Sequence, residues 1–273
     1  MIAIVTDSSA YMTRSEAKSL GVWVVPLTYT VNGHIYNETF VGENGDYQRL
    51  VFRSNYTSQT AHANISAFMS TFSELIQNGF EVLCITISSR LSGTYSSASI
   101  AAREVNSDKI TVVDSLSTAG GIYMLVEKAR AMATSGMEVA QIAEQLQNLR
   151  SKISIAFSVD DMTPLRQSGR LGIVRQSVGT VLNLKPMLKC VDGAVVSDGV
   201  ARGRYNQVNK MVEQISENAK KVFVHYVKDS DTVSALYNEV RHRFPNIEVR
   251  KRQLGPVLAI HLGLSTVGVV WSE

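Results

Sequence analysis

The sequence predicts an α/β protein with an N-terminal, mostly parallel sheet covered by helices on both faces and a C-terminal α/β domain with a mixed or antiparallel sheet. Over the first half of the chain, short apolar runs alternate with helical segments, a pattern typical of parallel sheets. Further on, strand-like segments flank Asp192-Gly193, a pair that favours the type I′ turn of an antiparallel hairpin. The 273 residues are enough for one large or two ordinary domains. We therefore expect two domains with a ligand slot between them.

The first domain is expected to span residues 1–155. Its strands are predicted at residues 2–6, 22–27, 82–87 and 110–113. An apolar stripe with helical spacing predicts an amphipathic helix that ends at Gly79, and its members are Ile65, Phe68, Met69, Phe72, Leu75 and Ile76. Good helix formers predict a second helix over residues 95–105. Two further helices are expected after residue 113.

The second domain is expected to span residues 156–273 and follows a strand at residues 153–159. Strands at residues 186–191 and 194–197 build the hairpin around Asp192-Gly193. Helices and strands then alternate, and their predicted ranges are residues 207–219, 222–227, 232–243 and 247–253. The sequence has no internal repeat or low-complexity linker, so the two domains are expected to pack closely.

The composition favours a cytoplasmic protein without a nucleic-acid partner. The 27 basic and 24 acidic residues leave a net charge of only +3, and the basic cluster between Arg241 and Arg252 fits a solvated face. No charged-then-apolar leader opens the sequence and no apolar run of about eighteen residues occurs, so we expect no stable membrane insertion. Cys84 and Cys190 are expected as free thiols. The histidines and cysteines lack metal-ligand spacing, so we predict no metal site and no cofactor.

The most informative motif is a hydroxyl-rich loop at residues 88–94, between a predicted strand and a predicted helix. Free backbone N–H groups and the helix dipole favour an anion at a helix N-terminus. Related segments follow other strands at residues 7–9 and 114–121, and another precedes a helix at residues 57–60. Because ligands of open α/β sheets bind at the carboxyl ends of the strands, these segments are expected to meet at one edge. Helix capping by serines is the structural alternative.

A carboxylate suits such loops because hydroxyls and backbone N–H groups satisfy it without a buried counter-charge. Ser92, Thr94 and the N–H of Gly93 fit this role. Thr57 and Ser58 either approach from the neighbouring segment or form a turn or cap of the following helix. Apolar residues that line an acyl slot, or else belong to the plain core, are Phe157, Ile173, Val174 and residues 178–184.

Two enzyme hypotheses use the same loops. A phosphoryl-transfer or phosphate-ligand-binding enzyme would bring Asp7, Asp114 and His261 to them. A serine hydrolase would pair Ser92 with His261. The sequence has no Walker lysine, no G-x-G-x-x-G after a strand and no G-x-S-x-G segment, which disfavours nucleotide binding and ordinary serine hydrolysis.

The chain resembles the DegV family of bacterial fatty-acid-binding proteins along almost its whole length. The segments that carry the resemblance are Val5-Thr6-Asp7-Ser8-Ser9, Val25-Pro26-Leu27, Thr57-Ser58-Gln59, residues 89–95, Val113-Asp114-Ser115, residues 165–171, residues 184–188 and His261-Leu262-Gly263. Two positions depart from the family pattern. Thr60 stands where the family usually has proline, and Gly263-Leu264-Ser265 replaces Gly-Pro-Gly.

The resemblance implies a carrier without turnover of its own, which binds a long-chain fatty acid noncovalently. The residues that it assigns to the ligand site are Thr57, Ser58, Ser92, Gly93, Thr94, Arg170, Arg202 and His261. The hydroxyl loops would hold the carboxylate, and the arginines and the histidine would lie around the head group. The implied partner is a fatty acid kinase that phosphorylates the bound acid to an acyl phosphate.

Overall fold

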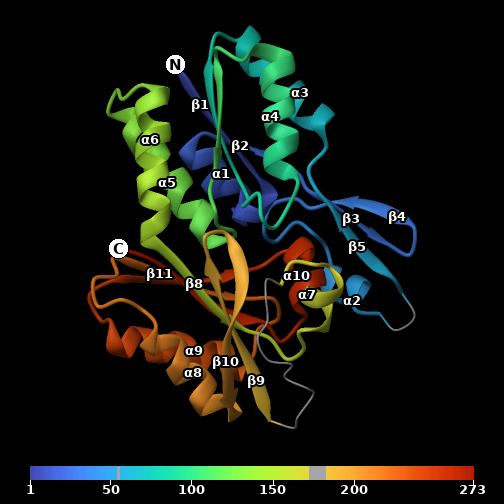
Figure 1. The fold of residues 1–273 in the computed structure, drawn as a ribbon, viewed down its shortest axis with the longest axis vertical. Coiled ribbons are helices and arrows are strands. Elements are labelled where there is room, and N and C mark those ends of the chain that lie inside the picture. The colour runs from blue at the N-terminus through green and yellow to red at the C-terminus, as the bar shows by residue number, and fades with distance from the viewer. Residues whose placement is uncertain (54–55, 172–182) are drawn as a thin grey trace.

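The computed structural model describes residues 1–53, 56–171 and 183–273. The described residues form two large sheets and one small sheet (Figure 1). The first large sheet is parallel, with the strand order β2-β1-β6-β7. Its strands are β1 (Ile2–Asp7), β2 (Val22–Val25), β6 (Glu81–Thr86) and β7 (Ile110–Asp114). These strands are largely buried, as their nearly continuous apolar sequences require.

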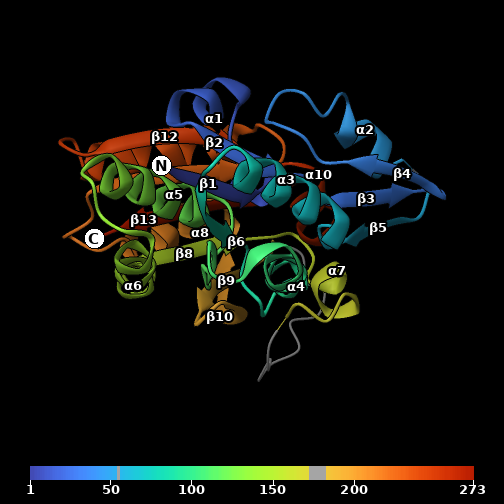
Figure 2. The same cartoon turned by 90° about the horizontal axis from the view of Figure 1, so that it is seen from above.

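Helices cover both faces of the parallel sheet (Figures 1 and 2). They are α1 (Arg14–Leu20), α3 (Ile65–Gln77), α4 (Thr94–Asn106), α5 (Gly120–Thr134) and α6 (Val139–Leu149). Alternate residues of β6 point to opposite faces, so Cys84 packs in a core with Phe68 of α3, while Leu83 packs in another with Ile122 of α5. The predicted amphipathic helix is confirmed, and Gly79 follows it with φ +78°.

The second large sheet is mixed, with the strand order β10-β9-β8-β13-β11-β12. Its strands are β8 (Ile153–Ser158), β9 (Leu184–Val191), β10 (Ala194–Arg202), β11 (Lys221–Tyr226), β12 (Glu248–Gln253) and β13 (Val267–Ser272). Within this sheet, β11 and β12 are the only described strands that pair in parallel. One face carries α8 (Gly203–Glu213) and α9 (Asp231–Arg243). The predicted fold class is confirmed, although α8 begins four residues before the predicted start at residue 207.

The β9–β10 hairpin reaches the loop that follows β6 (Figure 1). Asp192 and Gly193 have φ values of +47° and +80°, as a type I′ turn requires. At the tip, the Ser88 hydroxyl donates to the Gly193 carbonyl at 2.8 Å and the Arg90 guanidinium donates to the Asp192 carbonyl at 3.3 Å. The tip of the second sheet is therefore fastened to a loop of the first.

A small antiparallel sheet with the order β4-β3-β5 was not predicted. It consists of β3 (Thr28–Val31), β4 (His34–Asn37) and β5 (Ser58–Ala61), with α2 (Tyr47–Val51) nearby. The strand predicted at residues 22–27 ends at Val25, and the chain then enters this second sheet. Short connecting elements complete the description: η1 (Ser8–Ala10), η2 (Arg150–Lys152), α7 (Thr163–Gln167) and α10 (Pro256–Leu262). No described helix combines the length and hydropathy of a membrane span.

Candidate functional site

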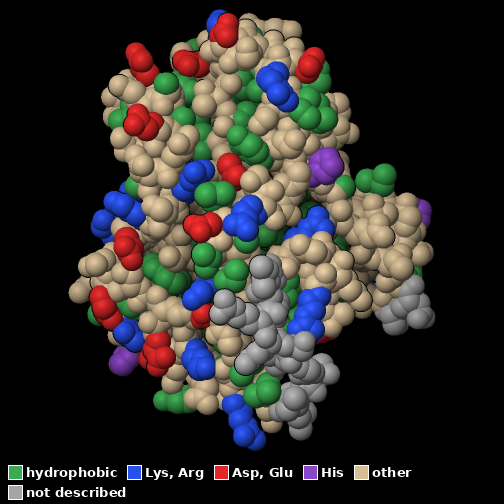
Figure 3. Space-filling model, in the orientation of Figure 1, with side chains coloured by type: hydrophobic (Ala, Val, Ile, Leu, Met, Phe, Trp, Pro, Cys, Tyr) green, Lys and Arg blue, Asp and Glu red, His purple; other side chains and the backbone are tan. Residues whose placement is uncertain are grey.

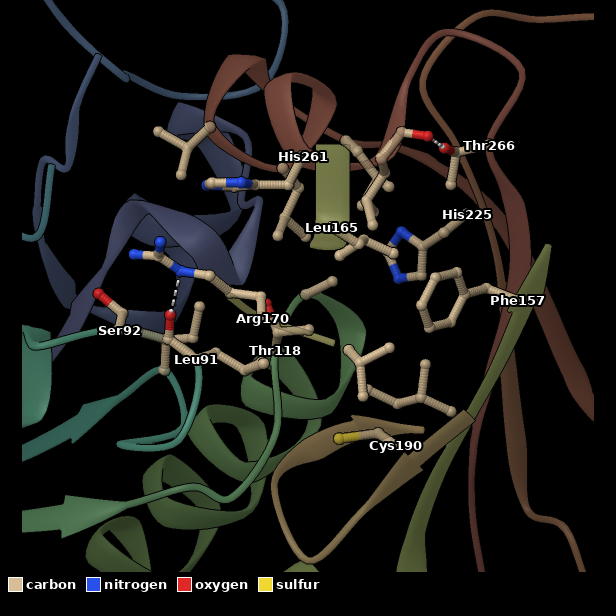
Figure 4. A pocket seen from close by; sticks show the side chains of 18 of the residues that line it. Leu91, Ser92, Thr118, Phe157, Leu165, Arg170, Cys190, His225, His261 and Thr266 are labelled. Carbon is tan, nitrogen blue, oxygen red and sulfur yellow. Dashed lines mark hydrogen bonds between the residues drawn. The ribbon is translucent and has the colours of Figure 1, made fainter. Parts of the chain in front are cut away.

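A cavity lies between the two large sheets, at the edge where the parallel strands end (Figure 4). The empty space inside it, with the open mouth included, is about 1090 Å³. The loops after β6 and β7 form one side, strands β8 and β13 form the opposite wall, and α10 and the end of β5 close it from the flank. The position agrees with the rule that open parallel sheets bind ligands beyond their carboxyl ends.

The two ends of the cavity differ in chemistry. The polar end is formed by Thr60, His62, Ser92, Gly93, Arg170 and His261. Figure 4 shows Ser92, Arg170 and His261 together on one side, and Phe157 and His225 on the other. His62 and Gly93 are exposed, whereas Phe157 and His225 are buried. The cavity therefore opens at its polar end.

Ser92 is held by the start of α4. The N-cap residue Gly93 has no capping side chain, and the Ser92 Oγ instead accepts from the Thr94 N–H at 3.3 Å. The buried Thr94 hydroxyl accepts from the Ala63 N–H at 3.3 Å and lies 2.8 Å from the Ser92 Oγ. With Thr94 as the donor in this pair, Ser92 keeps its own proton for an acceptor in the cavity. Thr94 thus positions Ser92 from behind the cavity wall.

Arg170 supplies a cation to the polar end. It follows α7 and Gly169, whose φ of +70° turns the chain back. Its Nε donates to the Leu91 carbonyl at 3.2 Å and its Nη1 donates to the Ser168 carbonyl. Two of five guanidinium N–H groups are used in this way, and no carboxylate among the described residues forms an ion pair with Arg170.

His261 faces the same space from the last turn of α10. Its Nε2 lies 2.7 Å from the Thr60 Oγ1. Burial, assisted by the positive charge of Arg170, lowers the pKa of His261 to about 4. The His261 imidazole is therefore neutral near pH 7, and it adds no positive charge to that of Arg170.

The rest of the cavity is lined mostly by hydrocarbon. Its apolar side chains include Ile87, Leu91, Ile155, Phe157, Leu165, Val195, Leu254, Val257, Leu258, Leu262 and Val270. Thr118, Thr266 and His225 are polar residues in this part of the lining. The Thr266 hydroxyl donates to the Leu262 carbonyl at 2.9 Å, whereas the buried Thr118 hydroxyl has no hydrogen-bond partner among the described residues.

Burial lowers the pKa of His225 to about 3. Its Nε2 accepts from the Gly120 N–H at 3.1 Å and its Nδ1 lies 3.1 Å from the Arg252 carbonyl. Both ring nitrogens are satisfied, so this end accepts an apolar group without an unpaired polar atom on His225.

Several predicted site residues meet here. Ser92, Gly93, Arg170 and His261 line the cavity, and Phe157 does so on the opposite wall. Other candidates for the acyl slot, at residues 173, 174 and 178–182, lie outside the described residues. Leu184, the last of that run, begins β9 away from the lining.

Four predicted site residues are not part of the cavity lining: Thr94, which lies behind the wall, and Thr57, Ser58 and Arg202. The Thr57 carbonyl accepts from the Asn32 N–H at 2.9 Å, and the Ser58 hydroxyl donates to the Val51 carbonyl at 3.1 Å. Both lie near the start of β5, whereas the end of that strand reaches the cavity. Arg202 is exposed at the end of β10, roughly 20 Å along the strand from the cavity residue Val195.

The residues proposed for the two enzyme hypotheses have structural partners. Asp7 is fully buried, and its carboxylate accepts from the N–H groups of Ser9 at 3.0 Å and Ile87 at 2.7 Å. Asp114 accepts from the N–H groups of Ser89 and Leu116. Neither lines the cavity.

The hydrolase hypothesis needs a bond between Ser92 and His261. The Ser92 hydroxyl is paired with Thr94 and the His261 Nε2 with Thr60. The side chains are therefore not arranged as a nucleophile and its base.

Thr60 and His62 were not predicted as site residues. The His62 ring lies against Gly93, with its Cγ 3.4 Å from the position that a Cβ would occupy there. Thr60 is the position at which the chain departs from the family pattern, and its hydroxyl contacts His261. The departure at Thr60 could have indicated this site residue from the sequence, because the threonine places a hydroxyl where the family usually has the apolar side chain of proline.

Comparisons with known proteins agree with this architecture. A family model described as an uncharacterised protein of the DegV family matches residues 1–273. A DegV domain-containing protein from Halalkalibacterium halodurans is 30% identical over 276 residues, which cover 99% of this chain and 98% of the relative.

Two solved structures are similar to this chain. A fatty-acid-binding DegV family protein from Thermus thermophilus has a TM-score of 0.89 and 31% identity, and the match covers 100% of this chain and 99% of that one. A stearic-acid-binding protein from Eubacterium ventriosum has a TM-score of 0.88 and 25% identity, with 100% and 98% covered. The full-length family match, together with the shared fold, shows that this chain belongs to the DegV family.

Proposed function

We propose that this chain binds a long-chain fatty acid noncovalently, with the carboxylate between Ser92, Arg170 and His261 and the acyl chain along the apolar walls. The observation that carries the proposal is the guanidinium of Arg170, which meets no carboxylate among the described residues at the open end of an apolar cavity. A guanidinium with free donors favours an oxyanion, and the hydrocarbon walls favour an alkyl chain. The fatty-acid-binding relatives from Thermus thermophilus and Eubacterium ventriosum support the same class of ligand.

The two parts of such a ligand contribute differently to binding. Each buried methylene contributes about 0.8 kcal/mol, so an acyl chain of palmitate length contributes about 10 kcal/mol before ordering costs are subtracted. A hydrogen bond to a charged group contributes about 1.5–3 kcal/mol. The acyl chain therefore supplies most of the affinity, whereas the polar end fixes the direction in which the ligand enters.

We further propose that the protein is a carrier that presents its ligand to a fatty acid kinase. In this reaction a carboxylate oxygen of the bound acid attacks the γ-phosphorus of ATP, and acyl phosphate and ADP are formed. The open polar end supports the proposal because it leaves the carboxylate within reach of a partner. Figure 3 shows side chains of both charges, Lys or Arg and Asp or Glu, around the tip of the β9–β10 hairpin. The positive charge at the open end is that of Arg170, and it suits an acyl phosphate as well as a carboxylate.

Isothermal titration with palmitate and with hexadecanol tests the binding proposal. The two ligands share the same chain length, but only palmitate carries a charge for Arg170. We expect palmitate to bind at least tenfold more tightly. Equal affinities would show that the polar end does not recognise a carboxylate.

The carrier proposal is tested with ATP, palmitate and a fatty acid kinase. Acyl phosphate should form only when both proteins are present, and this chain alone should not consume ATP. ATP consumption by the chain alone would overturn the carrier proposal.

A further inference from the structure

The end of the cavity opposite the carboxylate site contains an unusual row of residues across the mixed sheet. His225 on β11 pairs with Gly268 on β13, and Gly268 pairs with Phe157 on β8. Residues in register on neighbouring strands point to the same face of a sheet. All three line the cavity. The His225 ring lies on one side of Gly268 and the Phe157 ring on the other.

Gly268 leaves a notch, defined here as the space at its Cα that a Cβ would fill in any other residue. A Cβ at this position would lie 2.6 Å from the Phe157 Cβ and 2.8 Å from the Ala156 carbonyl oxygen. Because one of these contacts is with backbone, the clash could not be relieved by a side-chain rotation alone. The glycine therefore lets the Phe157 ring lie close to the sheet, beside the His225 ring.

The His225 ring is fixed at the other side of the notch. Its two nitrogens are bound to backbone groups of Gly120 and Arg252. A Cβ on Gly120 would lie 2.6 Å from the His225 Nε2, so this glycine allows the N-terminus of α5 to approach the ring. The imidazole is neutral and has no free nitrogen, and it therefore presents carbon atoms to a ligand.

We infer that Phe157, Gly268 and His225 form the wall that stops the methyl end of the ligand and so sets the preferred acyl chain length. The inference rests on the proposed function, because it takes the bound molecule to be a fatty acid with its carboxylate at the Arg170 end. Of the two rings, His225 is tied to the backbone by both nitrogens. Phe157 is the ring whose removal opens the wall without breaking a hydrogen bond.

The test compares Phe157→Ala with Phe244→Ala. The two phenylalanines are 8% and 7% exposed, but Phe244 packs in the core beneath α8 and α9 and does not line the cavity. Competition binding with saturated fatty acids of even chain length, from twelve to twenty-two carbons, gives the preferred length of each variant. Circular dichroism confirms the fold, and Phe157→Leu replaces Phe157→Ala in case the alanine variant does not fold.

We expect Phe157→Ala to prefer acids longer than the parent does, with about fourfold tighter binding for each added methylene that the new space accepts. Phe244→Ala should keep the parental profile. A folded Phe157 variant with the parental profile, or with no fatty-acid binding at all, would overturn the inference while the parent still binds. Absence of binding by the parent would instead contradict the proposed function.

Discussion

At the scale of single residues, Arg170 and Arg202 differ in position, because Arg170 lines the cavity whereas Arg202 lies elsewhere on the surface. Both were predicted to lie near the head group, and the motif around each contains glycine and arginine. Only Arg170 lines the cavity, because the turn after α7 directs it to Leu91. Arg202 lies at the far end of a long strand. Sequence alone did not distinguish them, since the distance along β10 becomes meaningful only once the hairpin tip is placed.

Arg170→Ala should weaken palmitate binding by about tenfold to a hundredfold, because it removes a charged hydrogen-bond donor from the carboxylate. Arg202→Ala is the matched control and should bind palmitate as the parent does. Titration calorimetry on the two folded variants measures the difference. If both variants lost affinity equally, the effect would come from net charge rather than from contact with the ligand.

The loop of Ser92, Gly93 and Thr94 shows which features of the site a sequence pattern can predict. The Ser-Gly-Thr loop at a helix N-terminus was recognisable from hydroxyls after a buried strand. The pattern did not separate Ser92, which lines the cavity, from Thr94, which contacts Ser92 from behind the wall. That distinction depends on the Ala63 N–H, which donates a hydrogen bond to the Thr94 hydroxyl. Ala63 belongs to a segment far away in sequence.

At the scale of elements, α10 illustrates a helix whose capping groups come from elsewhere in the chain. It begins after Gly255, which has no capping side chain. The fully buried Glu38 accepts from the Val257 N–H at 2.9 Å, and the Tyr11 hydroxyl accepts from the Leu258 N–H at 3.2 Å. The two side chains satisfy N–H groups of the first turn that would otherwise be unpaired. They thereby hold the helix that carries His261.

Glu38 makes the stability of this arrangement depend on pH. Burial raises the pKa of its carboxyl group from 4.5 to about 7. The contribution of the Glu38 carboxyl group to the free energy of unfolding is thus fully present below pH 4.5. It is lost as the pH rises through 7, by up to about 3 kcal/mol. Glu38→Gln keeps an oxygen for the Val257 N–H and removes the ionisation.

Urea unfolding at pH 5 and pH 8 measures the effect. The parent should lose stability relative to Glu38→Gln between these two values. The exposed Glu43, which pairs with Arg14, gives the control Glu43→Gln, for which we expect a small difference. A constant gap between the parent and Glu38→Gln across this range would mean that Glu38 does not titrate there.

Strongly periodic elements were the ones that sequence predicted well. The apolar stripe of α3 and the Asp192-Gly193 turn are local signals, and both are confirmed. The small sheet β4-β3-β5 was missed although Asn32-Gly33 is also a type I′ pair, with φ values of +49° and +83°. Its strands are only four residues long, and β5 pairs with β3 across more than twenty intervening residues, so no local pattern announces it.

At the scale of the whole molecule, contacts between distant parts of the chain join the mixed sheet to elements of the first part of the chain. Arg252 on β12 forms an ion pair with Glu16 on α1 at 2.7 Å, and its guanidinium lies over the Tyr123 ring. The Tyr47 hydroxyl donates to the Leu254 carbonyl at 2.5 Å. The order of elements predicted two sheets with a slot between them. It did not predict that α10, near the C-terminus, packs on β3 and β5, because that contact depends on tertiary packing rather than on local propensity.

The most direct test of the central claim is mass spectrometry of the purified full chain under native and denaturing conditions. A cavity lined mostly by apolar side chains favours a hydrophobic ligand over water. The native mass should exceed the denatured mass by that of one fatty acid, which organic extraction then recovers. Equal masses, together with no binding of added palmitate or oleate, would contradict the account.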